Sequence, residues 1–300
     1  MNWECLRLAR RSERGARCGF YVEGRRAGSI AADEARALAA WPHWFQPVDH
    51  GAWTMTVSPQ QRPAVFAEVN AALRERGSIR AWRDEPFALW NEDGAMVAVI
   101  ERASSRWWGA QTLGAHINGY VAGDDGRPAG LWIARRAWNK PTDPGRLDNL
   151  VGSGVPHGQS PRQAVCREAW EEAGLQMPEL QGLTAGRVIE LACDIPEGWQ
   201  HEWLYAYDLA LPAGRVPQNQ DGEVAEHRLL PIADALQCAA GGDMTTDAAL
   251  ATLDFALRHQ LLPAEEAQRL GPAFEALLVD PVRAAHFDPP GADTTLTPAR

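Results

Sequence analysis

Three glutamates in one short segment are the residues of this chain best suited to chemistry. The sequence Arg167-Glu168-Ala-Trp-Glu171-Glu172 places carboxylates at positions i, i+3 and i+4. In a helix these side chains lie on one face, where like charges repel by roughly 0.2–0.5 kcal/mol per pair. A cation is therefore expected beside them, and Mg²⁺ or Mn²⁺ fits because both ions prefer oxygen ligands and link carboxylates to phosphates.

A solvated acidic face is the alternative interpretation of the same residues. Arg167 and Glu171 stand at i, i+4 and could form an ordinary ion pair. Charge runs on helices are usually only solvated. The three glutamates by themselves therefore leave both interpretations open.

A single helix is predicted to position the glutamates. Ser160 can act as its N-cap, with Pro161 at the first helical position and Gln163 completing a capping box. Gly174 supplies the stop signal. The opposite face is predicted to pack and carries Val165, Cys166, Ala169 and Ala173.

Residues 153–175 resemble the signature of the Nudix hydrolases, Gly-x5-Glu-x7-Arg-Glu-U-x-Glu-Glu-x-Gly-U, where U is apolar. The chain departs from the signature twice, with Ser153 at the first glycine and Gln159 at the first glutamate. We expect the loss of a carboxylate at position 159 to tune metal affinity more than it removes catalysis. The matching positions are Arg167, Glu168, Ala169, Glu171, Glu172, Gly174 and Leu175.

This resemblance implies a strand, loop and helix unit within an α/β/α sandwich that binds Mg²⁺ or Mn²⁺. Glu171 and Glu172 would be metal ligands, and Glu168 would be a third ligand or the base that activates water. The carbonyl of Gly152 would be a further ligand, and Arg167 would hold Glu168 or its neighbour in place. Such enzymes work by positioning water and stabilising charge on a diphosphate.

The same resemblance implies one more carboxylate ligand from a distant loop. Glu223 is the first candidate, ahead of Glu226 and Asp221. A surface turn centred on Asp221 and Gly222 explains this run of residues equally well.

A basic cluster precedes the glutamate helix and is the predicted phosphate-binding site. It consists of Arg135, Arg136 and Lys140. The planar guanidinium group suits bidentate binding of phosphate oxygens. A hairpin edge protected by cations is the alternative interpretation.

Further segments resemble one Nudix subgroup, the thiamine-pyrophosphokinase-related proteins. They are residues 131–149, the run Asp221-Gly-Glu223-Val, and residues 20–30 and 81–85. The subgroup resemblance implies hydrolysis of thiamine diphosphate or its damaged analogues. ADP-ribose, dinucleotides and nucleoside triphosphates are alternative substrates, and a non-catalytic binding or sensing protein is an alternative from another class.

The length of 300 residues accommodates two domains. We predict a small α+β domain over residues 1–105, the Nudix domain with C-terminal helices over 106–285, and a disordered tail over 286–300. The N-terminal domain holds no comparable carboxylate cluster, so we expect it to contribute to substrate choice rather than to chemistry.

Local patterns predict the main elements of both domains. An Asp124-Asp-Gly126 turn predicts a hairpin within residues 116–136. Trp203, Tyr205 and Tyr207 share one strand face that either packs in the core or stacks on a flat ligand. The other predicted strands are 18–22, 52–57, 86–90, 203–209 and 228–230, and the other predicted helices are 59–76, 246–259 and 264–278.

Composition limits the partners and the compartment. A net charge of −10 and a pI near 5.3 argue against a nucleic acid or an anionic membrane as partner. The five cysteines lack Cys-x-x-Cys spacing, which favours reduced thiols. The arginines among residues 7–17 suggest a transit peptide, but an ordinary surface helix fits better, so a cytoplasmic location is predicted. The oligomeric state is left open.

Overall fold

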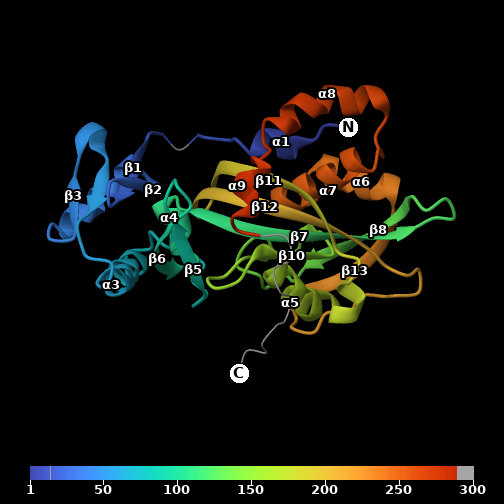
Figure 1. The fold of residues 1–300 in the computed structure, drawn as a ribbon, viewed down its shortest axis with the longest axis horizontal. Coiled ribbons are helices and arrows are strands. Elements are labelled where there is room, and N and C mark those ends of the chain that lie inside the picture. Colours follow the sequence, from blue (N-terminus) through green and yellow to red (C-terminus); the bar gives the residue numbers. More distant parts are fainter. Residues whose placement is uncertain (14, 289–300) are drawn as a thin grey trace.

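A seven-stranded mixed sheet forms the centre of the larger part of the computed structural model, which describes residues 1–13 and 15–288 (Figure 1). Its main path runs β11-β12-β7-β8-β13, with β10 paired to β7 and β9 paired to β8. Strands β12 and β7 are parallel, and the other pairs are antiparallel. The strands are β7 (Gln111–Ala122), β8 (Pro128–Arg136), β9 (Leu147–Asp148), β10 (Val151–Gly154), β11 (Thr184–Ile195), β12 (Gly198–Ala210) and β13 (Val224–Pro231).

Helices cover both faces of this sheet. Helices α1 (Glu4–Leu8), α6 (Ile232–Gly241), α7 (Thr246–Arg258) and α8 (Ala264–Glu275) lie on one face, and α5 (Pro161–Ala173) lies on the other (Figure 1). Each layer has a core of its own. The predicted α/β/α sandwich is therefore confirmed.

Helix α1 belongs to the core of the larger part, although it begins the chain. Trp3, Cys5 and Ala9 are buried in the same cluster as the side chains of α6 and α7. The Ala9 carbonyl accepts a hydrogen bond of 2.9 Å from the Ala192 amide of β11. The first residues of the chain therefore help to hold the sheet that carries the site.

An additional α+β domain lies beside the sandwich, at the left of Figure 1. Its core surrounds Trp108, whose indole packs against the rings of Phe20, Phe45 and Phe66. Its strands are β1 (Arg17–Val22), β2 (Arg25–Ala31), β3 (Phe45–Pro47), β4 (Trp53–Met55), β5 (Pro86–Trp90) and β6 (Met96–Glu101). Its helices are α2 (Ala32–Ala35), α3 (Arg62–Glu75) and α4 (Ser104–Trp108), with 3₁₀ turns at Arg36–Ala40 and Asp49–Gly51.

The predicted turn, aromatic stripe and tail have distinct outcomes. Gly126 sits at φ +76° in the turn between β7 and β8, a conformation that glycine adopts without strain. Trp203, Tyr205 and Tyr207 are buried, which confirms the core interpretation. Two further short elements are the 3₁₀ turn Met177–Leu180 and helix α9 (Pro281–Ala285). After α9, the ring of Phe287 packs on Trp203. Most of the predicted disordered tail, residues 289–300, lies outside the described residues.

Polar contacts join the two parts of the chain. Arg83 donates a hydrogen bond of 3.0 Å to the hydroxyl of Thr142, and Arg106 lies 3.4 Å from the carboxylate of Glu202.

All five cysteines are free. Within the described ranges, no helix is both long and apolar enough to cross a membrane.

Candidate active site

Helix α5 begins and ends where its capping residues predict. The Ser160 hydroxyl accepts a hydrogen bond of 3.2 Å from the Gln163 amide, and the Gln163 side chain accepts one of 2.9 Å from the Ser160 amide. Gly174 ends the helix in the left-handed conformation, at φ +64°. The predicted capping box and stop signal are therefore confirmed.

Strand β10 donates hydrogen bonds to two of the three glutamates. The Gly152 amide donates a hydrogen bond of 3.0 Å to Oε2 of Glu172. The Ser153 hydroxyl lies 2.8 Å from Oε1 of Glu168. The strand before the loop and the helix after it thus meet at the carboxylates.

Arg167 holds the other side of the cluster. Its guanidinium donates a hydrogen bond of 2.6 Å to Glu168 and another of 2.6 Å to Glu171. The (i, i+4) ion pair of the alternative interpretation is thus present, together with a second bond to Glu168. Arg167 fixes the orientation of both carboxylates.

Burial and mutual repulsion shift the protonation of two of the glutamates. Glu172 is only 6% exposed, and burial together with the negative charge of Glu168 raises its pKa to about 8. Burial, and next the charge of Glu168, also raises the pKa of Glu171. The positive charges of Lys140 and Arg167 offset these effects only in part. A divalent cation would relieve the remaining repulsion.

The donor set fits a hard metal ion, although its members bind other partners. In the described part of the chain, no group of three or more His, Cys, Asp or Glu side chains already surrounds a common metal position. Arg167 binds Glu168 and Glu171, while Glu172 accepts the Gly152 amide. All the available donors are oxygens, which suits Mg²⁺ or Mn²⁺. Metal binding would require the carboxylates to exchange partners.

The loop that contains Glu223 lies against the end of α5. The Gln220 amide donates a hydrogen bond of 2.8 Å to the carbonyl of Glu171. Glu223 forms an ion pair with Lys140, and the charge of Lys140 also acts on the buried Glu172. Lys140 thus pairs with the distant candidate ligand and is close enough to Glu172 for its charge to act there. The role of Glu223 as a metal ligand stays a prediction.

The three residues of the predicted basic cluster bind three different carboxylates, and only one of the three borders a cavity. Arg136 binds Asp148 over 2.9 Å and lies in the cavity described below. Arg135 binds Glu226 of the neighbouring strand over 3.3 Å and is not among the residues that line this cavity. Lys140 pairs with Glu223. Among these three cations, Arg136 alone borders the cavity, and phosphate binding by any of them stays a prediction.

Gln159 lies apart from the glutamates. It lines a separate hollow with Phe87, His157 and Phe287. Its side-chain oxygen is buried and has no hydrogen-bond partner among the described residues. The structure gives no contact between Gln159 and the carboxylates of α5.

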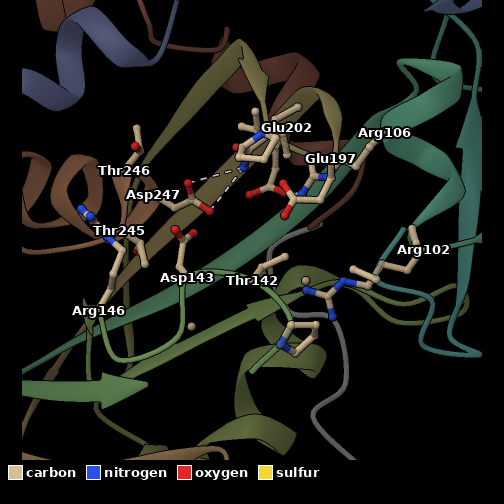
Figure 2. A pocket seen from close by; sticks show the side chains of 18 of the residues that line it. Arg102, Arg106, Thr142, Asp143, Arg146, Glu197, Glu202, Thr245, Thr246 and Asp247 are labelled. Atoms are coloured by element: carbon tan, nitrogen blue, oxygen red, sulfur yellow. Dashed lines mark hydrogen bonds and ion pairs between the residues drawn. The ribbon is translucent and has the colours of Figure 1, made fainter. Parts of the chain in front are cut away.

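A cavity of about 590 Å³ opens beside strand β10, between the sandwich and the N-terminal domain (Figure 2). Gly152, Ser153 and Gly154 form part of its wall. Figure 2 shows Arg102 and Arg106 on one side and Thr245, Thr246 and Asp247 on the other. A cavity of this size takes a ligand as large as a phosphorylated heterocycle.

Sequence reasoning missed most of the residues that line this cavity. In the sequence, Arg83 belongs to residues 81–85, a segment that resembles the thiamine-related subgroup. Its position directly before the pair Asp84-Glu85 suggests a local ion pair rather than a ligand site. Four other charged residues of the lining come from four different elements or loops, and no spacing pattern connects them: Arg102, Arg106, Glu202 and Asp247.

In comparisons with known proteins, the two parts of the chain match two different family models. The family model of the NUDIX domain matches residues 112–248, and that of a domain of unknown function (DUF4743) matches residues 3–112. Nudix hydrolase 20, chloroplastic, of Arabidopsis thaliana is 34% identical over 214 residues, which is 70% of this chain and 56% of that protein. Nudix hydrolase 24, chloroplastic, of the same plant is 34% identical over 213 residues, covering 70% and 58%.

The chain thus spans a little over half the length of these curated relatives. Among solved structures, the DR0079 protein of Deinococcus radiodurans has 23% identity and a TM-score of 0.42, over 57% of this chain and 99% of that one. The sequence matches and the glutamate helix lead to one assignment. Residues 112–248 of this chain are a Nudix domain, and the chain is a homologue of proteins named Nudix hydrolases.

Proposed function

We propose that this chain is a hydrolase that uses Mg²⁺ or Mn²⁺ to cleave the diphosphate of an X-linked diphosphate. The observation that carries the proposal is that strand β10 binds both Glu168 and Glu172, while Arg167 links Glu168 to Glu171. An acidic face that was only solvated would not need a buried Glu172, because burial of an uncompensated carboxylate is costly.

The residues of the chain have separate roles in this proposal. Glu171, Glu172 and the Gly152 carbonyl would hold the metal, with Glu223 as a further ligand. The bound metal would neutralise the diphosphate and increase the acidity of water.

Glu168 is the proposed base. It would accept a proton from the water that attacks phosphorus, while the bond from that phosphorus to the bridging oxygen breaks. Arg167 and Ser153 hold the carboxylate of Glu168 in position, as their hydrogen bonds indicate. The products are a monophosphate of the organic group and inorganic phosphate.

For the organic group we propose thiamine, either intact or as a damaged analogue. Residues 131–149 and 221–226 support this substrate by their resemblance to the thiamine-pyrophosphokinase-related subgroup. The cavity beside β10 has room for such a heterocycle. A cytoplasmic location remains our prediction, and the two plant relatives are named chloroplastic.

A panel of diphosphates tests the proposal. Purified protein is incubated with Mn²⁺ and thiamine diphosphate, ADP-ribose, a dinucleotide or a nucleoside triphosphate, and product formation is followed by chromatography. We expect metal-dependent cleavage, with the highest kcat/KM for thiamine diphosphate. Cleavage of none of these substrates would favour a binding or sensing protein instead, while a preference for ADP-ribose would correct the organic group alone.

A further inference from the structure

The cavity beside β10 receives arginines from the N-terminal domain. Arg83 precedes β5, Arg102 follows β6, and Arg106 lies in α4, and all three line the cavity together with Gly152–Gly154. The NUDIX family match begins only at residue 112. Positive charge from outside the Nudix domain therefore faces the strand that precedes the glutamate helix.

Among these three arginines, the positive charge of Arg83 is the least neutralised by neighbouring carboxylates. It is half-buried, and within the described residues no carboxylate lies within ion-pair distance of its guanidinium. Its guanidinium donates a hydrogen bond of 3.0 Å to the hydroxyl of Thr142. Burial, and then the positive charges of Arg102 and Arg136, lower its pKa to about 10. Such a group favours the approach of an anion.

Its two neighbours keep part of their hydrogen-bonding capacity. Arg102 uses Nη1 to bind Glu85 over 2.8 Å. A Cβ atom on Gly154 would lie only 3.2 Å from the Arg102 guanidinium, so this glycine lets the arginine approach the strand. The Nη1 atom of Arg106 is buried and has no hydrogen-bond partner in the described part of the chain.

Two carboxylates also line the cavity: Glu202 lies beside Arg106, and Asp247 lies on the other side, with Thr245, Thr246 and Arg146 (Figure 2). Glu202 is 6% exposed, and its partners Arg106 and Thr112 are 3.4 and 3.3 Å away. The side-chain amide of Gln200 lies 3.4 and 3.3 Å from the two carboxylate oxygens of Asp247 (Figure 2). The carboxylates of Glu202 and Asp247 repel a phosphate group, whereas Arg83 and Arg102 attract it.

We propose that Arg83 and Arg102 bind a phosphate group of the ligand, so that the N-terminal domain completes the phosphate-binding site of the Nudix domain. The inference rests on the proposed function for the identity of the ligand as a diphosphate. It goes beyond that function by assigning the phosphate contact to residues of the other domain. The organic group then lies towards Gln200, Glu202 and Asp247.

The first test measures binding of inorganic pyrophosphate by titration calorimetry in metal-free buffer, for the full-length chain. Arg83→Gln is compared with Arg83→Lys and with Arg76→Gln, which removes an exposed arginine of the same domain outside the cavity. We expect Arg83→Gln to weaken binding about tenfold, the effect of losing one hydrogen bond to a charged group. Arg83→Lys should retain part of the affinity, and Arg76→Gln should bind as the natural chain does.

A second readout is the steady-state kinetics of the metal-loaded protein with its best diphosphate substrate. Loss of a phosphate contact that is equal in the ground state and the transition state raises KM and leaves kcat nearly unchanged. We expect this pattern for Arg83→Gln and for Arg102→Gln, with thermal unfolding measured to confirm that each variant is folded.

The outcomes separate this inference from the proposed function. Unchanged pyrophosphate affinity in folded Arg83→Gln and Arg102→Gln, or no pyrophosphate binding by the natural chain, would overturn the assignment of the arginines. Absence of hydrolysis, combined with pyrophosphate binding that depends on Arg83, would instead refute the hydrolase and leave the phosphate site in place.

Discussion

At the scale of single residues, Ser153 changes how the proposed base is held. The Nudix signature has glycine at this position, which lacks a side-chain donor. In this chain the Ser153 hydroxyl lies 2.8 Å from Glu168 and equally close to the carbonyl of Gly154. Because a hydroxyl has one proton, it can donate to only one of them at a time. Glu168 therefore shares this donor with the backbone.

Gln159 gives a prediction in which stability and catalysis separate. The signature suggests that Gln159→Glu lowers the Mg²⁺ requirement at a similar maximal rate. The buried, unpartnered oxygen of Gln159 adds that a charge there costs stability, about 1–3 kcal/mol. Urea unfolding and an Mg²⁺ titration of the rate measure the two effects. A large increase in maximal rate would contradict this account and show that the natural chain is catalytically weakened.

At the scale of elements, the start of α5 depends on one hydroxyl. Ser160→Ala removes the acceptor of the Gln163 amide and is expected to cost about 1 kcal/mol of unfolding free energy. Ser160→Asp, which can still accept that hydrogen bond, should retain most of the stability. Denaturant unfolding compares the three proteins. Equal stability of Ser160→Ala and the natural chain would show that the cap contributes nothing.

Most elements with strong local signals were predictable from the sequence. The helix 246–259 is observed as Thr246–Arg258, and the strand 86–90 is observed as Pro86–Trp90. The helix expected from residue 59 begins only at Arg62, because Ser58 and Gln61 bond to each other in a turn before it. The sequence does not predict the strand Thr184–Ile195, because apolar Val188 and Ala192 occupy less buried positions of the strand and obscure its alternation.

The site was predictable only where its residues are close in sequence. The glutamates and their caps follow from one helix, and the structure positions them as a group. The wall formed by Arg83 and Arg102 depends on how two domains pack, and no local pattern encodes that packing. Pairing partners such as Lys140 and Glu223 are likewise 83 positions apart.

At the scale of the whole molecule, an ion pair ties the N-terminal segment to the sheet and makes stability depend on pH. A hydrogen bond from His201 and the nearby Arg10 lower the pKa of Glu190 to about 2. Because the folded-state pKa is depressed, this stabilisation is present above the unfolded pKa, about 4.3. It is lost as the pH falls from there towards 2.

Glu190→Gln is therefore expected to be less stable than the natural chain at pH 7, by roughly 1 kcal/mol for this partly exposed pair. The difference should shrink as the pH falls below 4. Urea unfolding between pH 7 and pH 3 measures it, with Glu265→Gln on the exposed surface of α8 as control. A difference that is constant over this range would rule out titration of Glu190 as its cause.

The dependence of the sandwich on its first residues gives a second prediction at this scale. A fragment that starts at Arg102 loses α1 and exposes the core that Trp3 and Cys5 cover. We expect it to unfold at a clearly lower temperature than the full chain, as followed by circular dichroism. If it does fold, metal binding should persist while discrimination among organic groups is reduced. An unchanged melting temperature would show that α1 adds no stability.

The most direct test of the central claim is the activity of Glu172→Gln over an Mg²⁺ titration. The glutamine can still accept the Gly152 amide, but it loses the charge that would hold the metal. We predict a rate loss of at least about a hundredfold, with a fold as stable as the natural one or slightly more stable. Glu68→Gln, on the exposed side of α3, should behave as the natural chain. Near-normal activity of Glu172→Gln at limiting Mg²⁺ would contradict the assignment of a metal-dependent site to this helix.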